Sequence, residues 1–207
     1  LNPGDVGVRA QIAQEQAKAG DHEGALRVIE EGLKTDTANI DLLTYAGIYG
    51  AQAAFRKQTD AAKQGASNEI PADAKAMYET SVNYYKKLFN IRNGDVEPPI
   101  ARQLIVTVVA LDRAPEAVEI GRRAVAAKGN SGQVWAAYAG ALANADQTAQ
   151  AIAAFDTAIA RNDTSATGLH KSKADVQLAS GDLEGAKASY RAAVSANALT
   201  ADAAPDA

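Results

Sequence analysis

The sequence predicts an all-α fold built from stacked pairs of antiparallel helices, and three observations predict it. The string Gly20–Ala25 returns as Gly181–Ala186 with five of six positions identical. Small and large side chains recur at helical spacing, and turn signals separate the helical segments at intervals close to 34 residues. A repeat of this length holds two helices of about 13 residues and two short turns.

The second helix of each repeat carries a ladder of small, large and small residues. In one copy the ladder is Ala151, Phe155 and Ala158. Residues four and seven apart share one helix face, so the ladder offers a groove, a knob and a second groove to neighbouring helices. The other copies are Ala25, Ile29, Gly32; Ala117, Gly121, Ala124; and Ala186, Tyr190, Ala193. In the copy that begins at Ala117, a glycine stands in place of the large middle residue.

A segment rich in apolar and small residues precedes each ladder helix and ends in a turn signal. These segments are Val8–Ala19, Ile40–Phe55, Ile100–Leu111, Val134–Ala143 and Leu169–Ala179. We therefore expect one repeat domain over residues 1–207, made of five hairpins and a short tail. Their approximate ranges are 6–39, 40–97, 98–131, 132–166 and 167–199, with the tail at 200–207.

The second hairpin is longer than the others. After Ala25 the next ladder is Ser81, Tyr85 and Leu88, which begins 56 residues later and leaves 22 extra residues. We expect both helices to be long, over Ile40–Lys63 and Ala72–Asn90, because these segments hold helix formers nearly throughout.

A competing register for this hairpin is Ala74, Tyr78 and Ser81, which would move part of the insertion into 93–99. In either register, Asn93-Gly94 ends the helix and Pro98-Pro99 restarts the chain.

The pattern resembles the tetratricopeptide repeat (TPR) family over about the whole chain. Trp135 with Tyr138-Ala139, and Ala46-Gly47, stand where that family has a Trp and a Leu-Gly pair in the first helix. The resemblance implies a right-handed superhelical solenoid whose inner wall comes chiefly from the first helix of each unit.

The resemblance also implies which side chains line the inner groove. They are Gln14, Lys18, Thr44, Tyr45, Ile48, Gln52, Arg102, Gln103, Ala136, Gly140, Asn144, Lys171, Ser172 and Asp175. Family members that grip a C-terminal carboxylate use Lys, Arg and Asn from three successive first helices. This chain departs from that clamp at the matching positions, which hold Ala10, Gln14, Tyr45, Pro99 and Gln103.

In the fourth unit, small side chains predict a shallow, uncharged channel for an apolar or helical segment. The alternative is that Ala is abundant there because it is the best helix former. The residues expected to face this channel are Ala136, Ala137, Gly140, Ala143 and Asn144.

We expect a non-enzymatic module that binds a protein or peptide segment in the concave groove. The alternative is a structural or assembly domain of a larger bacterial envelope or scaffold protein, which self-associates through the long hairpin. In that case Tyr78, Tyr84 and Tyr85 form a docking face, and otherwise they belong to the core. An enzyme or enzyme accessory is the third alternative.

Composition excludes several classes of function. The chain has no Cys and two His, so it offers no thiolate or paired-His metal site and we expect no cofactor. A net charge of −4 argues against nucleic acid, and no apolar run approaches the roughly 18 residues of a membrane span. We interpret His22 as a turn residue, His170 as a packing or groove residue, and Asp21 and Asp182 as helix caps.

The ends of the chain suggest a piece of a longer bacterial protein. Leu1–Asp5 is similar to the last residues of a preceding unit, and the first residue is not Met. The non-Met start and the absence of Cys favour a periplasmic or secreted location over the cytoplasm. We expect Asn197–Ala207 to fray or to lead onward in the parent protein.

Overall fold

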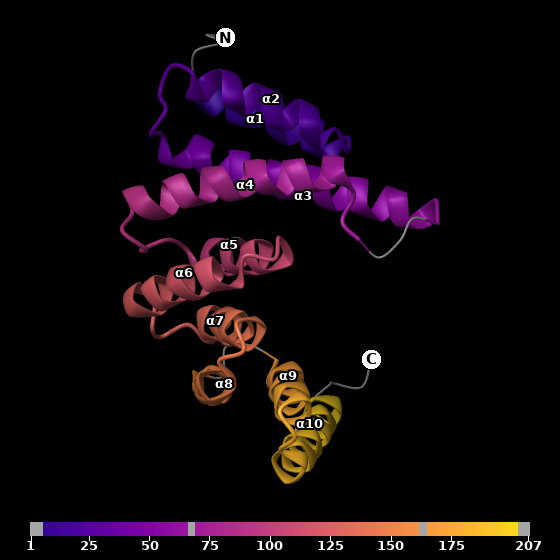
Figure 1. Ribbon diagram of the computed structural model, residues 1–207. Helices are drawn as coiled ribbons and strands as arrows, with labels where there is room; N and C mark the ends of the chain where they lie inside the picture. Colours follow the sequence, from indigo (N-terminus) through magenta and orange to yellow (C-terminus); the bar gives the residue numbers. More distant parts are fainter. Residues whose placement is uncertain (1–5, 66–68, 162–164, 203–207) are drawn as a thin grey trace. The chain divides into compact units, whose positions relative to one another are not determined.

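The computed structural model describes residues 6–65, 69–161 and 165–202. These residues form ten α-helices joined by turns, and no strand occurs among them (Figure 1). The predicted all-α class is therefore confirmed. The chain divides into two compact units, Leu1–Asn93 and Gly94–Ala207. The division falls at the predicted turn, where both Asn93 (φ 49°) and Gly94 (φ 87°) adopt the left-handed region.

The first unit contains two hairpins, α1–α2 and α3–α4, and neighbouring helices pack against each other in chain order (Figure 1). Both helices of the second hairpin are long, at 24 and 20 residues, which confirms the predicted elongation. The bounds are α1 Val6–Lys18, α2 His22–Leu33, α3 Ile40–Lys63 and α4 Ala72–Ile91.

The residues Ser81, Tyr85 and Leu88 of the first register are all buried in the long hairpin. In the competing register Ala74 and Ser81 are buried, whereas the large residue, Tyr78, is only partly buried. The Ser81 hydroxyl donates to the Gly47 carbonyl at 2.7 Å. The Tyr85 ring lies over Gly47, where a side chain would collide with it. The glycine thus lets two helices approach closely.

The second unit contains three hairpins, and its first helix begins at Pro98-Pro99 as the sequence predicts. In the third ladder, where Gly121 stands in place of a large residue, the ring of Tyr138 from the next hairpin fills the space. The bounds are α5 Pro98–Ala110, α6 Ala114–Ala127, α7 Gly132–Asn144, α8 Thr148–Arg161, α9 Ala166–Ala179 and α10 Leu183–Asp202.

The ladder residues lie in the core of both units, except Tyr190, which is only partly buried. Ala151, Phe155 and Ala158 are buried in one cluster with Leu142 and Leu169. The caps are confirmed as well, because Asp21 accepts from the Gly24 amide at 2.7 Å and Asp182 accepts from the Gly185 amide at 2.9 Å.

Helix α10 continues to Asp202, into the segment that was expected to fray or to lead onward. Residues 203–207 lie outside the described ranges, as do residues 1–5 and most of the 65–68 turn. The expectation of one repeat domain over residues 1–207 stays a prediction.

Candidate interaction surfaces

Helix α3 carries an exposed stripe that we call the α3 stripe: Tyr45, Ile48, Gln52 and Phe55. Their spacing of three, four and three residues places them on one helix face. Phe55 is 66% exposed, and Tyr45 and Ile48 are partly exposed. The sequence prediction included the first three residues and missed Phe55, although the same spacing continues to it.

The other faces of α3 are used for packing within the first unit. Leu42, Leu43 and Ala46 are fully buried. The Tyr45 ring stacks on Tyr49, with centroids 6.0 Å apart and an angle of 12° between the planes. Burial raises the pKa of the Tyr49 hydroxyl, and the neighbouring Tyr45 raises it further. The stripe is therefore presented by a helix that is fixed from behind.

The remaining groove candidates of the first unit are accessible. Gln14 and Lys18 are exposed on α1, and the Lys18 ammonium pairs with Glu15 at 2.7 Å. Thr44 is partly buried, and its hydroxyl donates to the Ile40 carbonyl at 2.8 Å. The Thr44 hydroxyl is therefore engaged within its own helix, whereas the side-chain amide of Gln14 is exposed and available to a partner.

In the second unit, the first helices also leave most predicted groove residues accessible. Arg102 is exposed on α5, and the Gln103 amide donates to the Thr107 hydroxyl at 3.1 Å. On α9, Lys171 and Ser172 are exposed, and Asp175 accepts a hydrogen bond from the Tyr190 hydroxyl, which raises the pKa of that hydroxyl.

The expected channel on α7 stays a prediction, and one of its residues needs correction. A Cβ at Gly140 would meet no atom within 4 Å, and Asn144 is exposed with its amide donating to the Gly140 carbonyl at 2.8 Å. Ala137, however, is only 7% exposed, and Ala136 and Ala143 pack partly against the core cluster. Ala137 therefore does not face a channel as predicted, while Gly140 and Asn144 are accessible.

The aromatic docking face needs correction. Tyr85 is 2% exposed and lies against Gly47, so it belongs to the core and cannot contact a partner. The Tyr84 hydroxyl donates to Glu30 at 2.9 Å, and burial together with this carboxylate raises the pKa of Tyr84 to about 12. The Tyr78 hydroxyl donates to Gln58 at 3.0 Å. The three tyrosines thus connect helices of the first unit.

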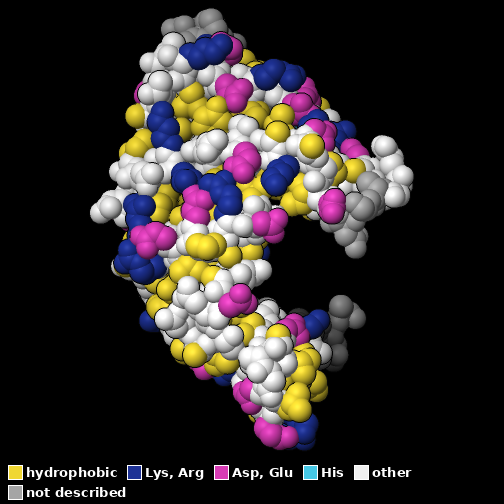
Figure 2. All heavy atoms as spheres, in the orientation of Figure 1, with side chains coloured by type: hydrophobic (Ala, Val, Ile, Leu, Met, Phe, Trp, Pro, Cys, Tyr) yellow, Lys and Arg dark blue, Asp and Glu magenta, His cyan; other side chains and the backbone are white. Residues whose placement is uncertain are grey.

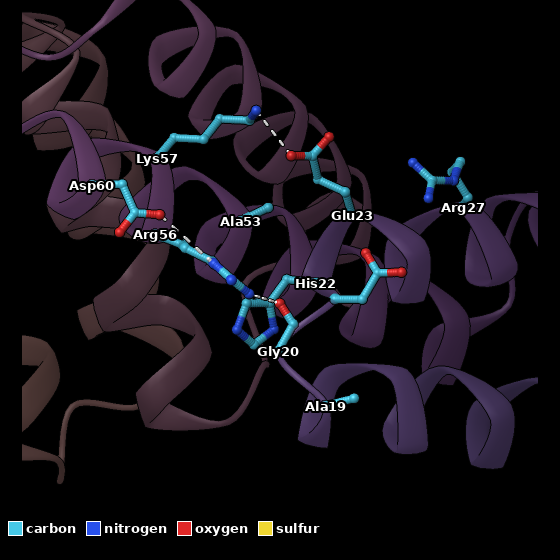
Figure 3. Close-up of a pocket in the computed structure, with 10 residues that line it drawn as sticks. Ala19, Gly20, His22, Glu23, Arg27, Ala53, Arg56, Lys57 and Asp60 are labelled. Atoms are coloured by element: carbon cyan, nitrogen blue, oxygen red, sulfur yellow. Dashed lines mark hydrogen bonds and ion pairs between the residues drawn. The ribbon is translucent and has the colours of Figure 1, made fainter.

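A pocket, which we call the turn pocket, lies where α3 passes the α1–α2 turn (Figure 3). Its volume is about 530 Å³, and its lining is mainly polar. His22, the first residue of α2, is partly buried and lines it. Neither His22 nor His170 belongs to a group of three potential metal ligands in the part of the chain that the structure describes.

The surface carries both signs of charge. On the face in Figure 2, Lys and Arg side chains are interspersed with Asp and Glu rather than gathered into one basic patch. Among the described helices, none combines the length and the apolar character needed to cross a bilayer.

No family model and no curated protein matches the sequence. Solved structures do match in fold. MamA from Desulfovibrio magneticus RS-1, from residue 41 to its end, has a TM-score of 0.71 at 15% identity, with 96% of this chain and 97% of that chain covered. YrrB, described as a TPR protein with an unusual peptide-binding site, has a TM-score of 0.66 at 17% identity, with 98% and 94% covered.

A third match, a thermophilic TPR protein of Thermus thermophilus, has a TM-score of 0.54 at 16% identity, with 90% of this chain and 89% of that chain covered. Identities this low show the fold and nothing finer. The adjacent helix hairpins, the buried ladders and these three likenesses agree. The chain has the fold of the tetratricopeptide repeat proteins, with an elongated second hairpin.

Proposed function

We propose that the protein is an interaction module that binds a protein or peptide segment along its first helices, with the α3 stripe as the main apolar contact. The observation that carries this proposal is the position of Phe55. It is 66% exposed and continues the face formed by Tyr45 and Ile48, with Gln52 between them. A single exposed apolar residue is ordinary, but an aligned aromatic and aliphatic set is typical of a contact surface.

The chemistry of the stripe suits an amphipathic or extended segment. Aromatic side chains bury a large area at small entropic cost and dominate many interfaces. Gln52 and, on α1, Gln14 and Lys18 supply polar groups beside an apolar centre. In the second unit, we propose that Gly140 lets a bound backbone approach α7 closely, because no atom lies within 4 Å of its missing side chain.

The comparisons support this proposal at the level of the fold. YrrB, which has the same fold, is described as having a peptide-binding site. TPR folds generally serve as non-enzymatic scaffolds, and concave repeat surfaces suit protein ligands. On this basis we propose a binding role and no catalytic one.

Peptide selection followed by a matched pair of variants tests the proposal. Peptides selected from a random library against the whole chain are titrated against Phe55→Ser and Ile91→Ser. Ile91 is the matched control, because it is an exposed apolar residue of the same unit but on α4. An aromatic anchor contributes about 2 kcal/mol or more, so Phe55→Ser should weaken binding by roughly 30-fold and Ile91→Ser by less than about twofold.

Phe55→Ser should melt at the temperature of the unaltered protein because Phe55 is 66% exposed, and Ile91→Ser, at 46% exposure, should melt close to it. Equal affinity of the two variants would show that the α3 stripe is not the contact. Self-association through the long hairpin has less support, because Tyr85 is buried and Tyr78 and Tyr84 are bonded within the unit. A mass that rises with concentration in sedimentation would revive it.

A further inference from the structure

The turn pocket exists because α3 is longer than the other first helices. Helices α1, α5 and α7 each have 13 residues, and a helix of that length starting at Ile40 would end at Gln52. Every α3 residue that lines the pocket lies beyond this point. These residues are Ala53, Arg56, Lys57 and Asp60.

Polar contacts join the overhanging part of α3 to the first hairpin. The Lys57 ammonium lies 2.9 Å from Glu23 on α2 and 3.4 Å from Asp73 on α4. Its hydrogen bond to Glu23 raises the pKa of Lys57, so the side chain stays cationic. Arg56 donates to the carbonyl of Gly20 in the turn (Figure 3). The walls of the pocket are therefore held together before any ligand binds.

The carboxylates that line the pocket already have partners, whereas the Arg27 guanidinium has none among the residues that the structure describes. Asp21 caps α2, Glu23 holds Lys57, and Asp60 lies 3.4 Å from Lys63. Arg27 has no ion-pair or hydrogen-bond partner within the described ranges, and it lines the pocket from α2 (Figure 3). The Nδ1 atom of His22 is buried and also lacks a partner there.

Arg56 has unused donors as well. Its Nε lies 3.8 Å from Asp60, which is beyond hydrogen-bond distance, and a guanidinium carries five N–H groups. A ligand that accepts hydrogen bonds would satisfy these groups.

The copy of this turn in the second unit shows that the turn does not require these groups. Gly181 adopts the same positive φ as Gly20 (85° and 83°), and Asp182 caps α10 as Asp21 caps α2. Where the first turn has His22 and Arg27, the copy has Leu183 and Ala188. The two polar side chains are thus additions to a turn that forms without them.

We propose that the turn pocket binds a single carboxylate of an acidic protein segment. A carboxylate accepts two parallel hydrogen bonds from one guanidinium, and Arg27 has the unused donors for such a pair. The lining has three cationic side chains and three carboxylates, so it is formally neutral. Asp21, Glu23 and Asp60 repel any anion in the pocket, and a phosphate dianion carries twice the charge of a carboxylate.

The turn pocket extends away from the α3 stripe. Lys57 follows Ile48 by nine residues, which is about two and a half helical turns, so the two side chains lie on opposite sides of α3. Arg56 follows Gln52 by four residues and so lies near the stripe, but the other walls of the pocket come from α2 and the α1–α2 turn. The inference therefore goes beyond the proposed groove, and either site can be present without the other.

Nuclear magnetic resonance titration of the ¹⁵N-labelled whole chain tests the proposal. The probes are the acetylated and amidated pentapeptide Ala-Gly-Glu-Gly-Ala, the same peptide with Gln in place of Glu, and inorganic phosphate. We expect the Glu peptide to shift the amide signals of residues 20–27 saturably, and the Gln peptide and phosphate to bind at least tenfold more weakly. The signals of residues 181–188 should stay in place, as an internal control.

The variant Arg27→Gln should weaken the Glu peptide about tenfold, while Arg191→Gln, an exposed cation of α10, should leave the affinity unchanged. Arg27 is exposed, so its variant should melt like the unaltered protein. Absence of shifts at residues 20–27, equal binding of phosphate, or unchanged affinity in Arg27→Gln would each overturn the proposal. Shifts confined to the α3 stripe would also overturn it, while supporting the proposed groove.

Discussion

We expect a Gly→Ala substitution to destabilise the protein at Gly47, which contacts Tyr85, and to stabilise it at Gly140, which has open space beside it. A Cβ at Gly47 would lie no more than 2.7 Å from three ring carbons of Tyr85, namely Cδ1, Cε1 and Cζ. Non-bonded carbons prefer about 3.5–4.0 Å. The ring is only 2% exposed, so it cannot turn into solvent, and the Ser81 hydrogen bond to Gly47 fixes the spacing of the two helices.

The magnitude follows from two opposing contributions. Ala in a helix interior is favoured over Gly by about 1 kcal/mol. Overpacking a close contact costs about 1–3 kcal/mol. Gly47→Ala should therefore lower the free energy of unfolding by about 1 kcal/mol. Gly140→Ala, at a helical site with no atom within 4 Å, should raise it by about 0.5–1 kcal/mol.

Urea denaturation measures both effects. Trp135 is the chain's one Trp and belongs to the second unit, so its fluorescence reports Gly140→Ala, while circular dichroism reports Gly47→Ala. In a Tyr85→Leu background, where the ring is absent, Gly47→Ala should become stabilising. A Gly47→Ala protein as stable as the unaltered one, or equal effects in the two backgrounds, would refute the packing argument.

Three further predictions follow from burial and titration. Ala151→Leu should lower the free energy of unfolding by about 1–3 kcal/mol, because Ala151 is fully buried. Ala149→Leu, at an exposed position, should change it by less than about 0.5 kcal/mol. Equal melting temperatures of the two variants would show that the assigned ladder register is wrong. The pKa of tyrosine is 10.0 in the unfolded chain and about 12 for Tyr84 in the folded protein. The stabilisation that comes from this difference should be fully present below pH 10 and should be lost as the pH rises from 10 to about 12. Tyr84→Phe should reduce that loss in urea titrations at pH 9 and 11. Gly140→Trp should leave the melting temperature nearly unchanged and abolish binding of any peptide that uses the α7 channel, and an early melt would show that Gly140 is needed for packing.

The sequence predicted the hairpins well because each ladder residue is a close helix contact. A position that tolerates only a small side chain keeps that restriction in every copy, as Ala25, Ala117 and Ala151 show by being fully buried. The elongation of the second hairpin was predictable for the same reason, since no ladder follows Ala25 at the usual interval and the candidates begin only at Ala74 or Ser81. The extension of α10 to Asp202 was missed because an Ala-rich segment can be helical without an amphipathic stripe.

The candidate sites were less predictable, because exposure depends on which helices pass one another. Tyr85 and Tyr84 stand side by side in the sequence, yet one lies against Gly47 in the core and the other reaches Glu30 of a different hairpin. Similarly, nothing local to His22 or Arg27 indicates that α3 extends far enough to complete a pocket beside them. The sequence indicates where the helices are, but it does not indicate which residues of different hairpins contact one another.

The extra length of α3 connects the two proposed sites. Phe55 of the α3 stripe and Arg56 and Lys57 of the turn pocket all lie beyond Gln52, where a 13-residue first helix would end. Consecutive residues on a helix point in directions about 100° apart, so one added segment can present an aromatic side chain to one side and cations to the other. The packing of the first hairpin does not need Phe55 to be apolar, because its side chain is mostly in solvent. The insertion therefore accounts for Phe55, Arg56 and Lys57, which the repeat pattern alone does not explain. All three side chains are at least partly exposed and so accessible to a partner.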